Sequence, residues 1–279
     1  LLPTLISQLD LDTDRIIVID NKSPDNSVSE IQSFIEKRNW QEFVKLIPAE
    51  VNGGFSYGNN LAIETAINFY NKKPLYVWFV NPDTQIKSNS LKALLEFSDE
   101  TPKVGIIGSR LESENGSVQD SAFRFCSISS ELLSSLSIGV LNKKFQRYLV
   151  SLPEMPDTSI ECDWVAGASM FVRYKVFENA GMMDETYFLY FEETDFCLQA
   201  KRAGWECWYV PESRVLHYVG QSTGIVSGDV QRRRRPKYWF QSRQHYFIKN
   251  HGIVYTMFAD LAWGLGFSLL QLRYLIQGK

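Results

Sequence analysis

Three carboxylates stand within four positions of one another in the stretch YFEETD, residues 190–195. Glu192, Glu193 and Asp195 follow an aromatic run and open a segment with apolar residues at helical spacing. Negative charge is favoured at the start of a helix, so an acidic first turn is one interpretation. A general base needs apolar surroundings that tune its pKa, and the aromatic residues before Glu192 favour this second interpretation.

A second candidate group is Asp83, which follows the most apolar run of the chain, LYVWFV at residues 75–80. The segment Asn81-Pro82-Asp83 ends that run. A carboxylate at the end of a central strand suits Mg²⁺ or Mn²⁺, which take hard oxygen ligands and share them with phosphate groups. A Pro-Asp turn without any ligand explains the same residues, and the pattern alone does not decide.

The elements that must position these groups are short apolar runs bounded by turn residues. RIIVID at 15–20, LYVWFV at 75–80 and VGIIGS at 104–109 alternate with helical patterns, whereas residues 111–160 are polar and uninformative. These runs predict an α/β fold with a mostly parallel central sheet flanked by helices. Ligands bind at the carboxyl ends of such strands, which places Asp20 to accept hydrogen bonds from a nucleobase or ribose. An Asx turn at Asp20 is the alternative.

A glycine-rich segment, NGGFSYGNN at residues 52–60, precedes a helix expected over residues 61–70. Glycine allows close backbone approach, and the start of a helix favours phosphate. The pattern lacks the G-x-G-x-x-G fingerprint and the Walker lysine, so it is weak by itself. The candidate ligand-binding residues here are Asn52, Gly53, Gly54, Asn59 and Asn60.

A further candidate pocket lies in ECDWVAGASMF, residues 161–171. Gly167 and Ala168 are small enough for a sugar to come close, and Trp164 offers a stacking face. A tightly packed core strand accounts equally well for this pattern. His217 is a lone histidine in an apolar stretch, which by itself is more typical of a core residue.

Charge is unevenly distributed over the 279 residues, whose net charge is −3. The segment from Asp229 onward holds nine Lys or Arg and two Asp or Glu, so the rest of the chain is acidic. With 44% hydrophobic residues the chain can form a full core. Its four cysteines form no CxxC pair and no signal peptide is recognisable, so we expect a reducing, cytoplasmic environment without a zinc site.

The C-terminal run 253–276 is long and apolar enough to resemble a membrane span. Thr256, Asp260, Gly264, Ser268 and Gln271 nevertheless form a narrow polar stripe on the expected helix, and a basic segment, Arg232–Arg235, precedes it. This combination favours an interfacial helix that contacts a membrane peripherally. A helix packed on the catalytic domain is the alternative.

Taken together, these motifs resemble inverting, family-2-like glycosyltransferases with the GT-A fold, in particular the rhamnosyltransferase-like branch. The matching segments are VIDNKSPD (18–25), NGGFSYGNN (52–60), NPD (81–83), DWVAGASMFVR (163–173), DETYFLYFEETDFCLQAKRAG (184–204) and HYVGQS (217–222). The resemblance covers nearly the whole chain. It implies a catalytic domain at 1–228, whose first strand we expect to be missing, and a basic, aromatic helical tail at 229–279.

The resemblance also implies roles for particular residues. Glu193 is the expected base, while Glu192 and Asp195 bind acceptor or orient the loop. Asp83 and His217 hold Mg²⁺ or Mn²⁺, and Asn81 contacts the sugar or ribose. With Asn81 and Asp83, the other expected donor-binding residues are Asp20, Asn52, Gly53, Gly54, Asn59 and Asn60. The implied donor is a dTDP- or UDP-sugar, with rhamnose or a similar hexose transferred to a glycan or lipid-linked acceptor at the inner face of the cell membrane.

Two other classes compete with this interpretation. A nucleotidyltransferase that makes nucleotide sugars should carry a Gly-rich loop with catalytic Arg and Lys near its start, and none is visible. A nucleic-acid-binding protein would use Arg232–Arg235, but apolar sequence flanks that run and the remainder is acidic. We therefore expect no nucleic-acid partner.

Overall fold

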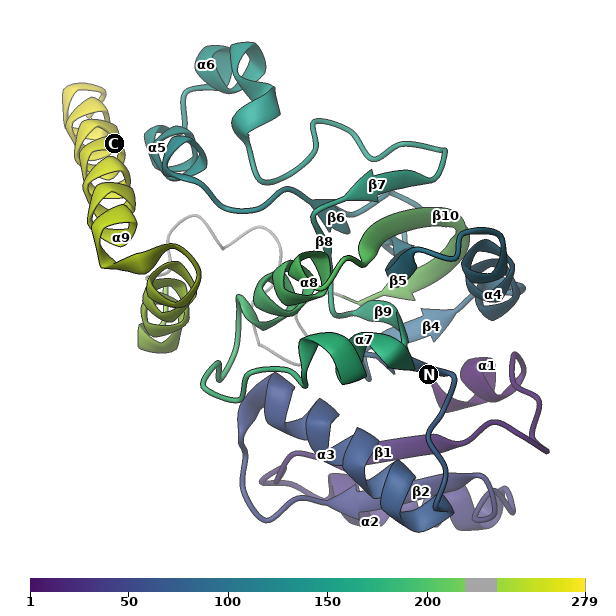
Figure 1. The fold of residues 1–279 in the computed structure, drawn as a ribbon. Coiled ribbons are helices and arrows are strands. Elements are labelled where there is room, and N and C mark those ends of the chain that lie inside the picture. The colour runs from purple at the N-terminus through teal and green to yellow at the C-terminus, as the bar shows by residue number, and fades with distance from the viewer. Residues whose placement is uncertain (219–234, 279) are drawn as a thin grey trace.

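The computed structural model describes residues 1–218 and 235–278, in which strands and helices alternate (Figure 1). In chain order the elements are α1 (Leu2–Ile6), β1 (Ile16–Asp20), α2 (Ser27–Lys37), β2 (Val44–Pro48), α3 (Gly54–Tyr70), β3 (Tyr76–Val80), β4 (Thr84–Ile86), α4 (Ser90–Glu100), β5 (Val104–Glu112), β6 (Ala122–Phe123), α5 (Ile128–Leu136), α6 (Gly139–Lys144), β7 (Ile160–Cys162), β8 (Trp164–Val165), β9 (Ser169–Arg173), α7 (Tyr174–Ala180), α8 (Glu192–Arg202), β10 (Glu206–His217) and α9 (Lys237–Ile276). A 3₁₀ turn, Gln146–Tyr148, follows α6.

The first two strands form a separate parallel pair. β1 runs beside β2 from Ile16 opposite Val44 to Asp20 opposite Pro48. Ile16 and Val44 pack with Ile35 of α2 in a small buried cluster. Figure 1 shows this pair with α2 and α3 at one end of the molecule, in purple and blue. The strand expected at residues 15–20 is confirmed, with Asp20 at its carboxyl end.

The main sheet has six strands in the order β3-β9-β5-β10-β4, with β7 paired to β10. β5 and β10 run parallel, whereas the β3–β9, β5–β9, β4–β10 and β7–β10 pairs are antiparallel. The expected mostly parallel sheet is therefore corrected to a mixed one. A continuous apolar run identifies a strand buried on both faces, but it carries no information about the strand's direction.

β5 lies at the centre of a three-layer core. On one face, Ile106 packs with Val176 of α7 and Phe196 of α8. On the other face, Ile107 packs with Leu94 of α4. Covering both faces excludes water from β5, which explains why its run VGIIGS has no polar alternation.

α3 begins at Gly54 rather than at Leu61, so the glycine-rich segment forms the first turns of the helix. Gly54 has φ +85°, a conformation that glycine adopts without strain. The expected loop over residues 52–60 is therefore mostly helical.

α9 is two helical segments joined at Gly252, whose φ is 81° and ψ 169°. The first segment, residues 237–251, packs against the chain before α8. The second, residues 253–276, lies along α5, and a Cβ on Gly266 would meet Ser135 Oγ of that helix at 2.0 Å. Figure 1 shows both segments at the edge of the molecule, in olive and yellow. The predicted boundary at 228/229 lies outside the described residues, and residues 237–251 pack on the predicted catalytic domain.

Candidate active site

Asp83 and His217 are brought together by two neighbouring strands. The turn after β3 places Asp83 directly before β4, and β10 pairs antiparallel with β4 so that His217 lies opposite Thr84. The amide of Tyr218 donates to Asp83 O at 2.9 Å. His217 Nε2 then lies 3.7 Å from Asp83 Oδ1, and both side chains are largely buried. The two predicted metal ligands therefore converge.

Gln119 orients the imidazole of His217. Its Oε1 lies 2.9 Å from His217 Nδ1, while its Nε2 donates to the backbone oxygen of His217 at 2.9 Å. Because the carboxamide oxygen can only accept, Nδ1 carries the proton and Nε2 presents a lone pair toward Asp83. Burial lowers the pKa of His217, although the charge of Asp83 opposes this shift, which favours the neutral ring.

Glu193 is held by the small-residue connection between β8 and β9. Its Oε1 accepts a hydrogen bond from Gly167 N at 3.1 Å. A Cβ on Gly167 would lie 2.8 Å from that oxygen and 2.7 Å from Phe55 Cζ. Only glycine therefore fits here without displacing the carboxylate.

Backbone strain precedes the two glutamates. Tyr190 and Phe191 have φ 71° and 70°, which is costly for bulky residues and must be compensated by their surroundings. Phe191 is the N-cap of α8, so Glu192 and Glu193 occupy its first turn. Strain of this kind is concentrated at functional sites, where the surrounding structure holds it in place.

Burial raises the pKa of both glutamates. The pKa of Glu192 is raised further by the neighbouring charge of Glu193, whereas hydrogen bonds to the backbone partly offset the shift at Glu193. Glu192 is 2% exposed, and its Oε2 has no hydrogen-bond partner among residues 1–218 and 235–278. Glu193 is half-buried and thus more accessible. The environment predicted for a tuned carboxylate is present at both positions.

The predicted metal ligands and the glutamates are linked through one short segment. The amide of Asn81 donates to Ala168 O at 3.1 Å, which ties the end of β3 to the residue after Gly167. Asn81, Gly167 and Ala168 thus connect Asp83 with Glu193.

The glycine-rich start of α3 is joined to the loop that precedes the glutamates. Phe55 N donates to Phe188 O at 3.1 Å, and a Cβ on Gly54 would meet that oxygen at 1.9 Å. Gly53 N and Gly54 N donate to Asn21 Oδ1 and Asn52 Oδ1. The first amides of α3 therefore donate hydrogen bonds to protein oxygens. Phosphate binding at these amides stays a prediction, and it requires that they break these hydrogen bonds and donate to phosphate instead.

Asn59 and Asn60 also contact protein groups. Asn60 is buried and donates to Met183 O and Glu185 Oε1, each at 2.8 Å, while Asn59 donates to Phe55 O at 3.0 Å. Asn60 thus supports the start of the loop 184–191. Donor contacts by either side chain stay predictions.

Asp20 and Trp164 each have a structural partner. Asp20 Oδ1 accepts from Ser23 N at 2.9 Å, which is the turn interaction considered as its alternative role. One face of the Trp164 ring stacks on Phe123 with a centroid distance of 4.1 Å, and its Nε1 donates to Arg124 O. Their proposed ligand contacts stay predictions.

Asp195 differs from the two glutamates because it is surrounded by a cation and an amide of α9 and by an amide of its own helix. Lys249 Nζ lies 2.6 Å from Oδ2, and Asn250 Nδ2 and Gln199 Nε2 donate to Oδ1 at 2.6 and 3.1 Å. The contacts of Lys249 and Asn250 join α8 to the first segment of α9. The geometry favours the loop-orienting part of its predicted role.

The sequence interpretation missed Gln119, Lys249 and Asn250. Gln119 lies in the polar region that carried no recognisable pattern, and a single glutamine gives no signal. Lys249 could have been found as a cation complementary to the acidic residues of 184–195, because it also lies 2.7 Å from Asp184 Oδ2.

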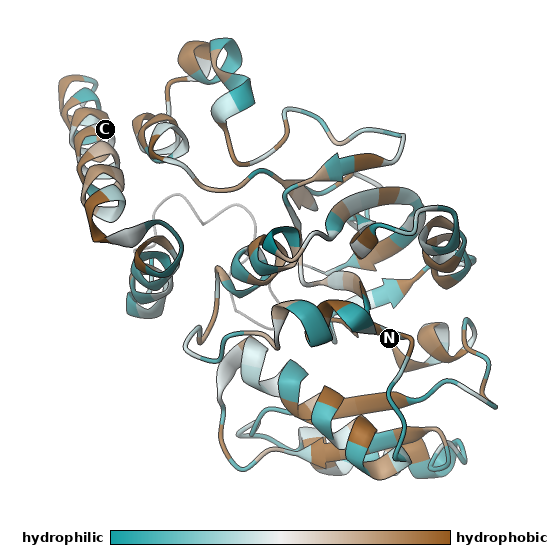
Figure 2. Cartoon of the chain, viewed as in Figure 1, coloured by the Kyte–Doolittle hydropathy of each residue, from teal (hydrophilic) through white to brown (hydrophobic). Residues whose placement is uncertain are grey.

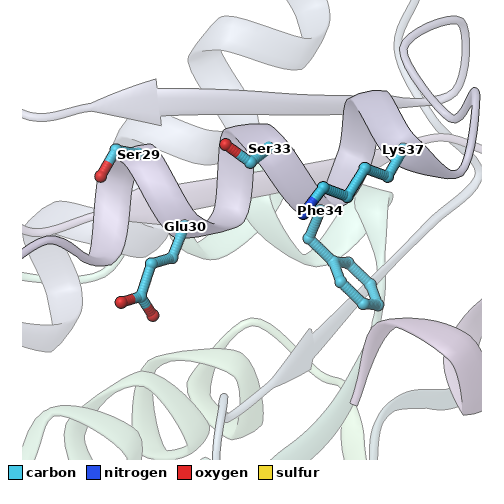
Figure 3. A pocket seen from close by; sticks show the side chains of 5 residues that line it. All are labelled: Ser29, Glu30, Ser33, Phe34 and Lys37. Carbon is cyan, nitrogen blue, oxygen red and sulfur yellow. The ribbon is translucent and has the colours of Figure 1, made fainter.

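A surface pocket on α2 is separate from this site. Ser29, Glu30, Ser33, Phe34 and Lys37 line it, and all five side chains project from the same helix (Figure 3). It contains none of the predicted site residues.

Comparisons with known proteins identify the family of this chain. Residues 1–151 match the model of glycosyl transferase family 2. The N-acetylglucosaminyl-diphospho-decaprenol L-rhamnosyltransferase of Mycobacterium tuberculosis is 26% identical over 80% of this chain and 73% of its own length. Rhamnosyltransferase WbbL of Escherichia coli is 27% identical over 77% of each chain.

A solved structure shares the fold. GalNAc-T7, crystallised with UDP, GalNAc and Mn²⁺, aligns with a TM-score of 0.57 at 13% identity, over 77% of this chain and 40% of that chain. The family model matches more than half of the sequence. This chain therefore belongs to glycosyl transferase family 2 and is a glycosyltransferase with the GT-A fold.

Proposed function

We propose that this glycosyltransferase moves rhamnose or a similar hexose from a nucleotide-diphospho-sugar, a dTDP- or UDP-sugar, to a glycan or lipid-linked acceptor, with inversion at the anomeric carbon. The relatives at 26% and 27% identity are rhamnosyltransferases by name, which supports the sugar. The observation that carries the mechanism is the hydrogen bond from Gly167 N to Glu193 Oε1, next to Ala168, whose backbone oxygen binds the end of β3 just before Asp83.

The residues at the end of β3 and β10 fit a divalent cation. A carboxylate oxygen and an imidazole nitrogen with a fixed lone pair converge, and such mixed donors suit Mn²⁺ or Mg²⁺. The described residues contain no group of three or more His, Cys, Asp or Glu that could hold a metal. Asp83 and His217 would therefore supply two ligands, with donor phosphate oxygens and water as the others. When bound, the cation would neutralise charge on the leaving diphosphate.

Glu193 has the properties required of the base. In a single displacement, the acceptor oxygen forms a bond to the anomeric carbon while the bond from that carbon to the diphosphate breaks, and the acceptor proton passes to a carboxylate. Glu193 is accessible, is fixed by Gly167 and lies in apolar surroundings that raise its pKa. Glu192 is more deeply buried, which favours a supporting role in acceptor binding.

The second segment of α9 supports peripheral membrane contact. Leu261, Leu265 and Leu272 are each more than half exposed, while Thr256 and Ala259 are buried against the domain. Figure 2 shows apolar residues, in brown, along this segment. α9 is long and apolar enough to cross a membrane by composition alone, but its contact with α5 favours lying on the surface. The basic run at Arg232–Arg234 lies outside the described residues.

Donor hydrolysis tests the proposed function. Purified protein is incubated with dTDP-rhamnose, UDP-glucose, UDP-GlcNAc and GDP-mannose, each with Mn²⁺ and with EDTA. We expect release of a nucleoside diphosphate from one donor, with Mn²⁺ only. NMR coupling of the anomeric proton in a transferred product should show inversion. Hydrolysis of no donor, or a retained configuration, would contradict the proposal.

A further inference from the structure

Three of the four cysteines lie close together in space. Cys162 of β7 is directly opposite Cys207 of β10 in the antiparallel pairing of these strands, which Figure 1 shows side by side. The two sulfur atoms are 4.0 Å apart. Cys197 of α8 packs in the same hydrophobic cluster and contacts Cys207. The reaction proposed above uses none of these thiols.

The strand pairing places Cys162 and Cys207 where a disulfide can form without backbone movement. Opposite residues of an antiparallel pair have Cα atoms about 4.5 to 5.5 Å apart. That separation lies within the range of about 4.4 to 6.8 Å found in disulfides. The sulfur atoms must approach to about 2 Å, which rotation about the two Cα–Cβ bonds can provide. Cys197 is on a helix, so strand register does not align its Cβ with that of Cys207.

The two thiols differ in their access to solvent. Cys162 is partly exposed, whereas Cys207 is 5% exposed. Burial raises the pKa of the Cys207 thiol, and its contacts with Cys162 and Cys197 raise it further. Because the thiolate is the reactive form, a soluble oxidant should react first at Cys162, and Cys207 should then attack the oxidised sulfur. An accessible thiol with a second thiol beside it is typical of reversible redox sites.

We propose that Cys162 and Cys207 are a redox modification site at which hydrogen peroxide forms a reversible disulfide, and that this crosslink stabilises the part of the chain that carries Glu193. The Cys162 sulfur bonds to one peroxide oxygen as the O–O bond breaks, and the released hydroxide takes the thiol proton to become water. The Cys207 sulfur then bonds to the Cys162 sulfur as the S–O bond breaks, and the Cys207 proton leaves with that hydroxide as a second water. Two thiols are oxidised, and one peroxide is reduced.

The disulfide would close a loop around the proposed base. Cys162 and Cys207 are 45 positions apart, and β8, β9, α7 and α8 lie between them. Gly167 and Glu193, which are joined by their hydrogen bond, both lie inside this loop. A disulfide restricts the unfolded chain, and it stabilises the folded state more when the loop is longer. The oxidised protein should therefore unfold at a Tm higher by about 5 °C.

Counting thiols in the full chain tests the inference. The reduced protein is treated with hydrogen peroxide, which catalase then removes, and is unfolded and labelled with N-ethylmaleimide. Mass spectrometry should find four labels before peroxide, one for each cysteine, and two afterwards. Peptide mapping should find the crosslink between Cys162 and Cys207. Dithiothreitol should restore four labels and the lower Tm, which distinguishes the disulfide from oxidation of methionine or from a sulfinic acid.

Two variants serve as controls. C162S should keep all three of its thiols after peroxide, with no change in Tm. C126S removes the thiol outside the cluster, where burial raises the pKa of Cys126 to about 12, and should show the same crosslink and the same rise in Tm as the wild type.

Four labels in the wild type after peroxide, a crosslink that includes Cys197, or a disulfide without a rise in Tm would overturn the inference. The thiol count and the Tm do not depend on any glycosyl donor. A failure of the proposed function would therefore be seen separately, in the donor hydrolysis experiment.

Discussion

Gln119 and His217 form a two-point contact in which the carboxamide binds both the ring and the backbone of the same histidine. A ring held by Nδ1 alone could still tilt, whereas the second bond fixes the carboxamide and therefore the direction of the Nε2 lone pair. Groups of this kind, behind a metal ligand, set ligand tautomer and orientation.

Gln119→Leu should therefore weaken Mn²⁺ binding by about 10- to 100-fold. The histidine keeps its place through β10 but loses the acceptor that holds the proton on Nδ1. The Mn²⁺ affinity can be measured by electron paramagnetic resonance titration in the presence of a nucleoside diphosphate. Gln119→Glu retains an acceptor at Nδ1 and should recover most of the affinity. Equal losses in both variants would mean that Gln119 acts only through packing.

Asp83→Ala should abolish metal-dependent binding of a nucleoside diphosphate, because the charge of the diphosphate would go uncompensated. His217→Ala should reduce it by about 10- to 100-fold, as for one ligand among several. Calorimetry with and without Mn²⁺ provides the measurement. Wild-type affinity in Asp83→Ala with Mn²⁺ would show that the metal binds elsewhere.

Gly167→Ala should displace Glu193, because the new Cβ would lie 2.8 Å from its Oε1 and 2.7 Å from Phe55 Cζ. We expect a loss in turnover of about 10²-fold, the lower range for an impaired general base. Gly264→Ala is the matched control, since no atom lies within 4 Å of a Cβ there. If Gly167→Ala turned over substrate as fast as Gly264→Ala does, the position of Glu193 would be irrelevant to catalysis.

Glu193→Gln should lose about 10²- to 10⁴-fold in turnover. Burial raises the pKa of Glu193, so the unprotonated base is lost on acidification at a higher pH than for an ordinary glutamate. The acidic limb of kcat/KM in the wild type should therefore lie above the usual glutamate range, and the residual activity of the variant should lack that limb. A profile with the same acidic limb in both proteins would assign it to another group.

The Glu192→Gln variant should be more stable than the wild type, by a margin that grows as pH rises. Burial and the neighbouring Glu193 raise the pKa of Glu192, so the folded state holds this proton at a pH where the unfolded chain has released it. Stability therefore falls as pH rises through that window, and an amide removes the dependence. Thermal melting from acidic to neutral pH should show a Tm advantage for the variant that grows with pH. A constant difference would mean that Glu192 does not titrate in this range.

Much of the fold could be predicted from the sequence because its strands are buried runs with clear boundaries. The runs at 15–20, 75–80 and 104–109 became β1, β3 and β5 within a few residues. Strand direction could not be predicted, since burial on both faces looks the same in either direction. The start of α3 was misplaced because glycines were interpreted as a loop, although Gly54 begins the helix with a positive φ.

The candidate site was partly predictable because several of its residues belong to short sequence motifs. Asp83, His217, Gly167 and Glu193 belong to local motifs, and the fold brings them together as two groups around one segment. Gln119 and Lys249 act through long-range contacts, 98 and 54 positions from His217 and Asp195, and carry no local pattern. Pairings of that kind become visible only when the chain is folded.

The contact between Gly54 and Phe188 has a consequence for how this enzyme can change. The start of α3 and the loop before the glutamates meet backbone to backbone, with no side chain between them whose size could be adjusted. A substitution at Gly54 must therefore move both segments at once. Evolution or engineering that reshapes the 184–191 loop, while keeping the start of α3 in place, has to work around this position and begin at residues whose side chains can change in size.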